Sequence, residues 1–364
     1  MAEFDSIEAL AEEIRSKLDL ATDKKKVIAM YAFNATGKTR LTGMLSESSD
    51  ENEEENDQIT VLCYNAFIED MFTWDNEAYT LSFNQNSWII KLITEQGLEN
   101  EIVDNFKELI SSKIEPVFDF ENGKVTFSIT TGDDENSDNI KVSRSEESML
   151  IWSIFYTVLD AAIEALNTNE EDRTTSVFNS LKYIIIDDPV SSVDDTRIIA
   201  MAIKLIDRVK EVEGSNLKFF LTTHHALFFN ILVNSFRRDA NFSFKSFRLS
   251  QNLDRKLRLE KQGDAPFSYH LVIKHILQEA IQNDCIEKYH FNLFRNLVEK
   301  TSNFLGYGNW DECLAEEKKT EFRRALNVYS HSRLSDLESR GVSQDDKVLL
   351  QEMFNTFITT YKWK

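Results

Sequence analysis

One short stretch limits the folds open to this chain more than any other. Residues 26–33, KVIAMYAF, form an apolar run with the length and composition of a buried strand. The residues that follow, 34–41, read NATGKTRL. The Gly-Lys-Thr at 37–39 matches the end of the loop pattern G-x-x-x-x-G-K-[ST], whose first glycine position holds Ala32 here. The segment therefore predicts a strand, a tight turn and a helix in direct succession.

Each residue type in this loop suits the binding of a nucleotide phosphate. In such a loop the backbone N–H groups point inward and the helix N-terminus faces the phosphates. Gly37 allows close approach, Lys38 would contact the β- and γ-phosphates, and the Thr39 hydroxyl would bind Mg²⁺. Ala32 is small enough to replace glycine if its φ angle stays negative. The predicted nucleotide-binding residues are Asn34, Ala35, Thr36, Gly37, Lys38, Thr39 and Arg40.

The match of residues 32–39 to the phosphate-loop pattern is weak alone, but two carboxylates at the end of a second apolar strand strengthen it. The run LKYIIID (181–187) has the β-branched composition of a buried parallel strand and leads into Asp187 and Asp188. Asp187 would hold Mg²⁺ through water, and Asp188 would orient or activate the attacking water. The alternative is a pair that only starts a turn, because Pro189 follows directly.

Two further segments would complete the site. The run LKFFLTT (217–223) is another apolar strand and places His224 at its end, where the imidazole would sense a γ-phosphate. A histidine there is otherwise only a polar strand terminus. The segment VSRSE precedes a long helical pattern, and its Ser143, Ser145 and Glu146 would bind the γ-phosphate of a nucleotide held by a second subunit.

Strand and helix patterns alternate along the first two thirds of the chain, which predicts an α/β fold with a parallel sheet. The predicted strands are 26–33, 58–67, 124–131, 181–187 and 217–223, and the predicted helices include 143–166 and 196–212. After about residue 265 the pattern is helical throughout. Gly263 and Pro266 interrupt the chain there, so we expect one domain at 1–264 and a helical one at 265–364.

The order of these motifs, over roughly residues 26–226, resembles the ABC-type ATPase heads of the SMC and DNA-repair group. The resemblance implies an ABC-type P-loop NTPase head with a mixed or parallel sheet, and at least a homodimer, because two such heads enclose two nucleotides. The usual signature L-S-G-G-[QE] is V-S-R-S-E here, with Ser145 in a glycine position, and Asp188 stands where a Glu is usual. About a hundred residues separate Lys38 from Ser143, which leaves no room for long coiled-coil arms.

Composition argues against some classes of protein. No apolar run approaches the roughly 18 residues of a membrane span, and the acidic, amphipathic N-terminal segment is unlike a secretory signal. The three cysteines, Cys63, Cys285 and Cys313, fit neither a disulfide framework nor a zinc site and suit a reducing cytosol. We therefore expect a cytoplasmic protein without membrane contact.

Charge is distributed unevenly along the chain. The net charge of −21 argues weakly against nucleic-acid binding, because phosphate contacts need Lys and Arg. Residues 46–58, SESSDENEEENDQ, are a low-complexity acidic run and are predicted to form a flexible, solvated loop. Residues 236–261, in contrast, carry eight basic and three acidic side chains, which would either contact RNA or form an ordinary solvated surface.

The helical region contains a second set of candidate catalytic side chains. Arg295 and Glu299 are four residues apart and would share one helix face, and Ser330 and His331 follow later. The simpler interpretation is an ordinary ion pair and a surface histidine. The functional interpretation is metal-independent RNA cleavage, with His331 as general base or acid, Glu299 as its partner, and Arg295 stabilising charge on phosphorus. The nucleophile would be the ribose 2′-hydroxyl, so this chemistry needs no metal.

Several longer stretches resemble the bacterial anticodon nuclease family of PrrC over nearly the whole chain. They are YAFNATGKTRL, YNAFIEDMFTWDN, EESMLIWSIFYTVLD, LKYIIIDDPVSSVDD and FRNLVEKTSNFLGY. The family's Arg-x-x-x-Glu pair and downstream histidine fall on Arg295, Glu299 and His331 of this sequence. The family also tolerates alanine at the first position of the phosphate loop, here Ala32.

This resemblance implies a function, cofactors and partners. It implies cleavage of a tRNA, typically lysine tRNA, beside the wobble base, as part of anti-phage defence. GTP or ATP with Mg²⁺ would bind the NTPase site, and thymidine triphosphate (dTTP) is a further ligand that the family implies. A type I restriction–modification enzyme would hold the protein inactive until a phage inhibits that enzyme. The alternatives are an ABC-type ATPase sensor or scaffold without nuclease activity, and a DNA-repair accessory ATPase.

Overall fold

A computed structural model of the chain describes residues 2–47, 58–65, 72–75, 77–110, 113–130, 136–137, 140–190, 193–214, 216–251, 256–262, 269–330 and 341–362. The strands are β1 (Ala2–Phe4), β2 (Lys25–Ala32), β3 (Val61–Tyr64), β4 (Phe72–Asp75), β5 (Thr80–Phe83), β6 (Ile114–Asp119), β7 (Lys124–Thr130), β8 (Asn136–Ser137), β9 (Tyr183–Asp187), β10 (Lys218–Thr223), β11 (Phe242–Gln251) and β12 (Leu257–Lys261). The helices are α1 (Ile7–Asp19), α2 (Lys38–Ser46), α4 (Trp88–Gln96), α5 (Glu99–Ile110), α6 (Arg144–Asn167), η1 (Glu170–Asp172), α7 (Asp195–Glu211), α8 (Ala226–Phe236), α9 (Tyr269–Gln282), α10 (Lys288–Leu305), η2 (Trp310–Cys313), α11 (Glu316–Ser330) and α12 (Gln344–Thr360). Most of the acidic run 46–58, together with Arg255 and His331, lies outside the described residues.

The chain divides into two compact units, Met1–Pro266 and Phe267–Lys364. We call the first the head and the second the helical unit. The division falls within the same Gly263–Pro266 stretch at which the sequence changes from mixed to helical patterns.

The head is built on a seven-stranded mixed sheet with the strand order β1-β12-β11-β2-β10-β9-β3. Strands β11, β2, β10, β9 and β3 are parallel neighbours, whereas β12 and β1 join the β11 edge in antiparallel pairs. The apolar runs that read as buried strands in the sequence are the central strands, because parallel strands covered on both faces are apolar throughout. Residues 26–32 of β2, for example, are all buried.

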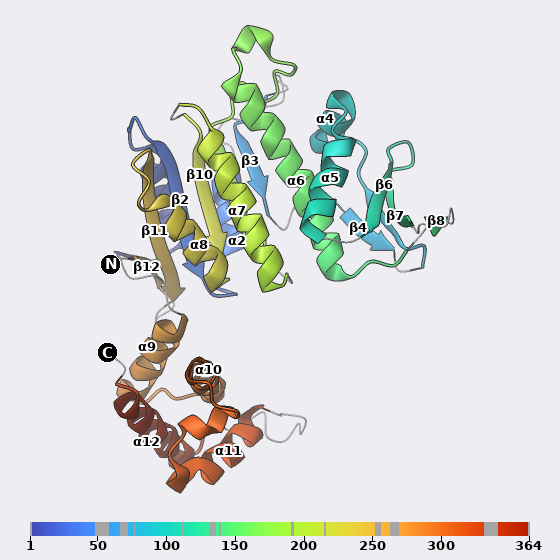
Figure 1. Ribbon diagram of the computed structural model, residues 1–364. Coiled ribbons are helices and arrows are strands. Elements are labelled where there is room, and N and C mark those ends of the chain that lie inside the picture. The colour runs from blue at the N-terminus through green and yellow to red at the C-terminus, as the bar shows by residue number, and fades with distance from the viewer. Residues whose placement is uncertain are drawn as a thin grey trace. The chain divides into compact units, whose positions relative to one another are not determined.

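Helices cover both faces of this sheet. Figure 1 shows α7 and α8 in front of it and α2 behind it. One core cluster joins α1 and α2 to alternate residues of the sheet, including Ile28, Met30 and Ala32 of β2. On the opposite face Tyr31 packs against Phe229 of α8, with ring centroids 5.9 Å apart. Successive β2 side chains therefore point to opposite faces, as the two-residue period of a strand requires.

The strand order brings the predicted motifs together. Strand β10 lies between β2 and β9, and in this register Thr222 is the partner of Asp187 while Thr223 is the partner of Tyr31. The C-terminal ends of the three strands are therefore neighbours at the same end of the sheet. Ligands of open α/β sheets bind at the carboxyl ends of the strands, so the phosphate loop, the carboxylate pair and His224 lie where a nucleotide site is expected.

A second sheet, with the order β4-β5-β7-β6 and β8 paired to β7, is antiparallel. It contains the strand expected at 124–131, which is β7, so the predicted strands are divided between two sheets. The physical reason is the composition of these strands. Strand β6 has the burial pattern of one covered and one exposed face, with Phe118 buried and Val117 exposed, and such alternation is typical of antiparallel sheets.

Figure 1 shows the long helix α6 between α5 and the β3 edge of the main sheet, and Tyr64 of β3 packs on Trp152 and Phe155 of α6. Its N-terminus has a capping box, in which Ser143 Oγ accepts a hydrogen bond from the Glu146 N–H and Glu146 accepts one from the Ser143 N–H. Within the described residues α6 is the one helix long and apolar enough to cross a membrane, but 78% of its apolar window is buried inside the head. It is accordingly a core helix.

The helical unit packs α9, α10, α11 and α12 around one apolar core. Phe294 of α10 is fully buried and meets Phe322, Phe354 and Phe357 edge to face, with centroid distances of 5.3, 5.9 and 5.6 Å. The predicted fold class, an ABC-type α/β P-loop head with a mixed sheet followed by a mainly helical unit, is confirmed.

Candidate nucleotide site and candidate nuclease residues

The loop at 33–37 joins β2 directly to α2. Ala32 is fully buried and, as the last residue of β2, has extended backbone, which is the condition under which alanine replaces glycine. Gly37, which precedes the first residue of α2, has φ +92° and ψ 19°. A Cβ atom at Gly37 would lie 2.8 Å from Ile7 Cδ1, at the start of α1. The left-handed backbone therefore favours glycine here, and any larger residue would also displace the Ile7 side chain.

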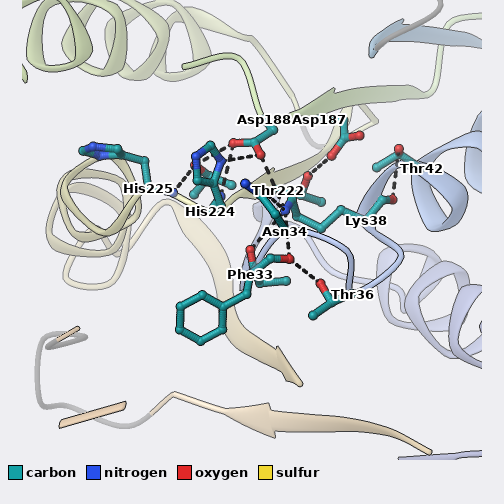
Figure 2. Close-up of polar contacts among 12 residues, drawn as sticks. Phe33, Asn34, Thr36, Lys38, Thr42, Asp187, Asp188, Thr222, His224 and His225 are labelled. Atoms are coloured by element: carbon teal, nitrogen blue, oxygen red, sulfur yellow. Dashed lines mark hydrogen bonds and ion pairs between the residues drawn. The ribbon is translucent and has the colours of Figure 1, made fainter. Parts of the chain in front are cut away.

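The Lys38 side chain folds back across this loop. Its Nζ donates to the carbonyl oxygens of Ala32 and Phe33, each at 3.1 Å, and lies 3.4 Å from Asn34 Oδ1. The residue is only 6% exposed. Figure 2 shows its ammonium directed toward Asp188, whose Oδ2 lies 3.5 Å away. The ammonium is thus held at the centre of the loop, where a phosphate-binding lysine acts.

The other predicted loop residues lie on the rim of the site. Ala35 is exposed and has φ +63°, and the Thr36 hydroxyl donates to a loop carbonyl at 2.6 Å. Thr39 and Arg40 are exposed on the first turn of α2. Arg40 makes an ion pair with Glu8 of α1 at 3.2 Å, so α1 contacts the loop helix through charge as well as through packing.

Asp187 ends β9 and is 6% exposed. The hydroxyl of Thr222, its cross-strand partner on β10, donates to Asp187 Oδ1, as Figure 2 shows. This hydrogen bond orients the Asp187 carboxylate at the C-terminal ends of the strands, where the phosphate loop and α2 also begin.

Asp188 adopts a backbone conformation that is rare for a residue with a side chain, with φ +52°. Its N–H donates to the Thr222 carbonyl oxygen at 3.0 Å, which holds the backbone in place. A non-glycine residue in the left-handed region costs about 1–3 kcal/mol and occurs mostly at functional sites. This backbone conformation directs the Asp188 carboxylate away from the strand and toward Lys38 and His224.

His224 binds Asp188 through two groups. Its ring Nδ1 lies 2.5 Å from Asp188 Oδ2, and its backbone N–H donates to Oδ1 at 3.1 Å (Figure 2). Burial alone would raise the pKa of Asp188, but the hydrogen bonds from His224 and the nearby Lys38 ammonium outweigh it and hold this pKa below its ordinary value. Asp188 is therefore ionised at neutral pH, which is the form that accepts a proton or a hydrogen bond from water.

These residues fit a bound nucleotide with Mg²⁺. The loop ends at the N-terminus of α2, and a helix N-terminus favours anions such as phosphate. Thr39 and Asp187 supply a hydroxyl and a carboxylate, which are oxygen ligands of the kind that Mg²⁺ prefers. When bound, Mg²⁺ would offset negative charge on the phosphates.

The signature segment, VSRSE at 142–146, is joined to the start of α7 by a side-chain hydrogen bond. Ser143 and Arg144 are exposed at the N-terminus of α6. Ser145, in the usual glycine position, accepts a hydrogen bond from Arg197 Nη1 at 3.0 Å, and Arg197 Nε lies 3.4 Å from Asp194, which caps α7. The substitution of serine for glycine thus creates a polar bridge from the signature to the turn that follows β9.

The basic segment 236–261 is mostly the β11–β12 hairpin, and several of its charges are paired within the head. Arg248 contacts Glu260 at 2.5 Å, while Arg258 contacts Glu3 at 3.2 Å across the β1–β12 pair. Lys256 lies 2.8 Å from Asp5. Paired cations contribute less to phosphate binding, so the structure favours the solvated-surface interpretation of this segment over an RNA contact.

Arg295 and Glu299 lie side by side on α10. Arg295 Nε donates to Glu299 Oε1 at 2.7 Å, and both side chains are partly exposed, at 38% and 34%. The Arg295 guanidinium carbon also lies 5.2 Å from the centroid of the Trp310 ring. The third predicted nuclease residue, His331, is outside the described residues, so the assembly of all three stays a prediction.

A mixed sheet with a phosphate loop, an Asp-Asp strand end and a strand-end histidine on adjacent strands defines a P-loop NTPase head of the ABC type. Such heads bind nucleotide together with Mg²⁺. No protein-family model matches the chain. A curated protein of Escherichia coli named anticodon nuclease is 40% identical over 334 residues, which cover 85% of this chain and 83% of that protein. The chain belongs to the anticodon nuclease family, and it is an enzyme that combines a nuclease with an NTPase head.

A comparison with solved structures also gave matches. They include the SMC head domain from Thermotoga maritima, with 10% identity and a TM-score of 0.33 over 67% of this chain and 92% of that one. Another is named RNase-L Inhibitor, with 11% identity and a TM-score of 0.34 over 71% of this chain and 38% of that one. These scores are low, and the assignment of the head rests on strand order and motif geometry.

Three contributors to the site were not predicted from the sequence. Thr222 orients Asp187, Arg197 bridges the signature to α7, and Trp310 lies against Arg295. Only Thr222 had a detectable signal, because it is polar within an otherwise apolar strand. The partners of Arg197 and Trp310 depend on how helices pack, which no local pattern encodes.

Proposed function

We propose that this chain is a tRNA anticodon endoribonuclease whose cleavage is controlled by nucleotide binding and hydrolysis in a dimer of heads. The observation that carries the proposal is the 40% identity to the E. coli anticodon nuclease, because an alignment covering 85% of this chain reaches into both units. Within this proposal the substrate is lysine tRNA, cut beside the wobble base, as the family resemblance implies.

The proposed nuclease site is centred on α10. Helix α11 ends at Ser330, one residue before His331, and Tyr329 packs on Phe291 with ring centroids 4.8 Å apart. Phe291 is about one helical turn before Arg295, which supports a site formed by the end of α11 and the exposed face of α10. Arg295 and Glu299 share one face of α10 and are both partly exposed, so both are accessible to a substrate, as the catalytic assignment requires.

Cleavage in this site uses the substrate's own ribose. The 2′-oxygen forms a bond to phosphorus while the bond from phosphorus to the 5′-oxygen breaks, which leaves a 2′,3′-cyclic phosphate and a 5′-hydroxyl. His331 and Glu299 would remove the 2′-hydroxyl proton and supply a proton to the 5′-oxygen. Arg295 would stabilise the extra negative charge on the phosphoryl oxygens. No protein-bound metal takes part in this proposed step.

Charge supports the helical unit as the part that meets RNA. Residues 267–364 contain 13 Lys and Arg against 14 Asp and Glu, whereas residues 1–266 contain 28 against 48. The negative charge that repels RNA phosphates is thus almost entirely in the head.

The head geometry supports control by nucleotide. Ser143 is exposed at the N-terminus of the long helix α6, where it is accessible to a nucleotide held by a second head. A homodimer or a higher oligomer is therefore proposed, with GTP or ATP and Mg²⁺ in each phosphate loop. Binding of dTTP, cytoplasmic location, silencing by a type I restriction–modification enzyme and release during phage infection are further parts of the proposal, which rest on the family resemblance.

Sequencing of RNA 5′-hydroxyl ends after induced expression tests the proposal. Wild-type protein should produce a new end in an anticodon loop, and Arg295→Ala and His331→Ala should abolish it while nucleotide hydrolysis continues. Lys38→Ala should remove nucleotide binding and with it the control of cleavage. His275→Ala serves as a matched control, because His275 is half-exposed on α9 and pairs with Glu279. Hydrolysis without tRNA cleavage under any nucleotide condition would instead support the sensor or scaffold function.

A further inference from the structure

Arg295 is fixed by contacts on two sides of its guanidinium group. On one side Nε donates to Glu299 Oε1 at 2.7 Å. On the other side the guanidinium carbon lies 5.2 Å from the ring centroid of Trp310, which is within the range of a cation–π contact. The hydrogen bond through Nε and the cation–π contact together limit rotation of the planar group, and so limit the directions in which its remaining N–H donors point.

The sequence after α10 explains how Trp310 returns to Arg295. Helix α10 ends at Leu305 and is capped by Gly306, whose φ of +77° reverses the chain. The Ser302 hydroxyl then donates to the Asn309 carbonyl at 2.9 Å, and the Asn309 N–H donates to Glu312 at 2.9 Å in a capping box. These bonds hold the short helix η2 back along α10, so the first η2 residue, Trp310, lies beside the middle of that helix.

The same short helix is attached to α11 from its other side. Asp311 is only 2% exposed and forms ion pairs with Arg323 and with Lys319, the latter at 3.8 Å. Cys313 and Leu314 are buried in the core of the helical unit. Helix η2 is therefore braced between α10 and α11, and the position of the Trp310 ring is set by both helices.

We propose that Trp310 is a positioning residue for RNA cleavage, which holds the Arg295 guanidinium in the orientation that meets the transition-state phosphate. This inference rests on the proposed function, because it assigns Trp310 to the nuclease site on α10. Displacing a charge-stabilising group by about 1 Å can slow a reaction by up to about a hundredfold. Loss of the cation–π contact should therefore lower the rate at saturating tRNA and leave KM nearly unchanged.

Trp310→Leu and Trp310→Phe in the full-length protein form the first test. Single-turnover cleavage of tRNA should slow about tenfold in Trp310→Leu, and Trp310→Phe should recover most of the rate because it keeps an aromatic face. Trp88→Leu, the same change at a half-exposed tryptophan of the head, should leave the rate unchanged. Thermal unfolding of each variant checks that the helical unit is intact.

A spectroscopic measurement tests the contact without using activity. In protein labelled with ¹⁵N-arginine, the ring current of Trp310 should shift the Arg295 Nε–H resonance upfield, and Trp310→Leu should abolish the shift. An unshifted resonance in wild type, or equal cleavage rates in wild type and Trp310→Leu, overturns the inference while the proposed function stands. A raised KM at unchanged rate also overturns it, because that result assigns Trp310 to base stacking with RNA. If the wild type shows the shift but cuts no tRNA, the proposed function fails and the contact is only structural.

Discussion

Replacement of Gly37 by alanine tests the geometry of the phosphate loop quantitatively. The backbone at Gly37 is left-handed, and this conformation costs an L-residue about 1–2 kcal/mol. Part of that cost is offset, by about 0.4–1 kcal/mol, because alanine also restricts the unfolded chain. The added Cβ would also lie 2.8 Å from Ile7 Cδ1. The Ile7 side chain must rotate away and lose part of its burial, at a further cost of about 1 kcal/mol.

The net expectation is that Gly37→Ala lowers the free energy of unfolding of the head by about 1–2 kcal/mol. In an Ile7→Ala background the steric part disappears, so the same change should cost about 1 kcal/mol less. Urea unfolding followed by circular dichroism measures both values. A fluorescent nucleotide analogue measures the accompanying loss of affinity, since the displaced loop no longer surrounds the phosphates.

Gly97 provides a matched control for this cycle. It has φ +67° at the C-terminus of α4, and no atom lies within 4 Å of a Cβ built there. Gly97→Ala should therefore show the backbone cost alone, with no dependence on Ile7. If Ile7→Ala reduces the cost of Gly37→Ala no more than that of Gly97→Ala, the close contact between α1 and the loop is refuted.

Three further predictions concern the head. Asp188→Asn should slow nucleotide hydrolysis by roughly 10²–10⁴-fold while binding of a nucleotide analogue persists, because the variant retains the fold and loses the base; an unchanged turnover rate would refute the assignment. Arg197→Ala should weaken nucleotide-dependent dimerisation in light-scattering measurements without changing nucleotide affinity of a single head, because it removes the bridge to Ser145. Burial raises the pKa of Asp160 from 3.8 to about 6, although Arg208 lies 2.5 Å away and opposes the shift. The neutral form is thus favoured in the folded state, and this contribution to stability is present below pH 3.8 and is lost as pH rises through about 6. The free energy of unfolding of wild type should therefore fall relative to that of Asp160→Asn as the pH is raised from 5 to 7. An equal change in the free energy of unfolding of the two proteins over this range would contradict the reasoning.

The sequence predicted the structure best where a strand is specified by its own run of apolar residues. The apolar runs before Gly37, Asp188 and His224 predicted three strands, and the strand order brought all three ends together. Of the second sheet only the strand at 124–131, which is β7, was predicted, and the shorter strands β4, β5 and β6, of four to six residues, were missed. Such strands have a weak periodic signal.

The finer geometry of the site depends on contacts between distant segments. The left-handed backbone of Asp188 has no sequence signature, because aspartate at a strand end normally has negative φ. Packing of Ile7 on Gly37 joins α1 to a loop about thirty residues later. The ion pairs of the basic hairpin are similar, since Arg258 meets Glu3 only after β1 pairs with β12. A count of charges along the sequence could not separate paired cations from unpaired ones.

The order of the strands in the main sheet has a consequence for synthesis of the chain on the ribosome. Strand β2, which carries the phosphate loop, is bounded on both sides by strands made much later, β10 from Lys218 and β11 from Phe242. The loop residues leave the ribosome early, yet their neighbours in the sheet follow almost two hundred residues afterwards. The helical unit, at Phe267–Lys364, is translated after all of these strands. During translation the whole of the head is therefore made before the helical unit begins.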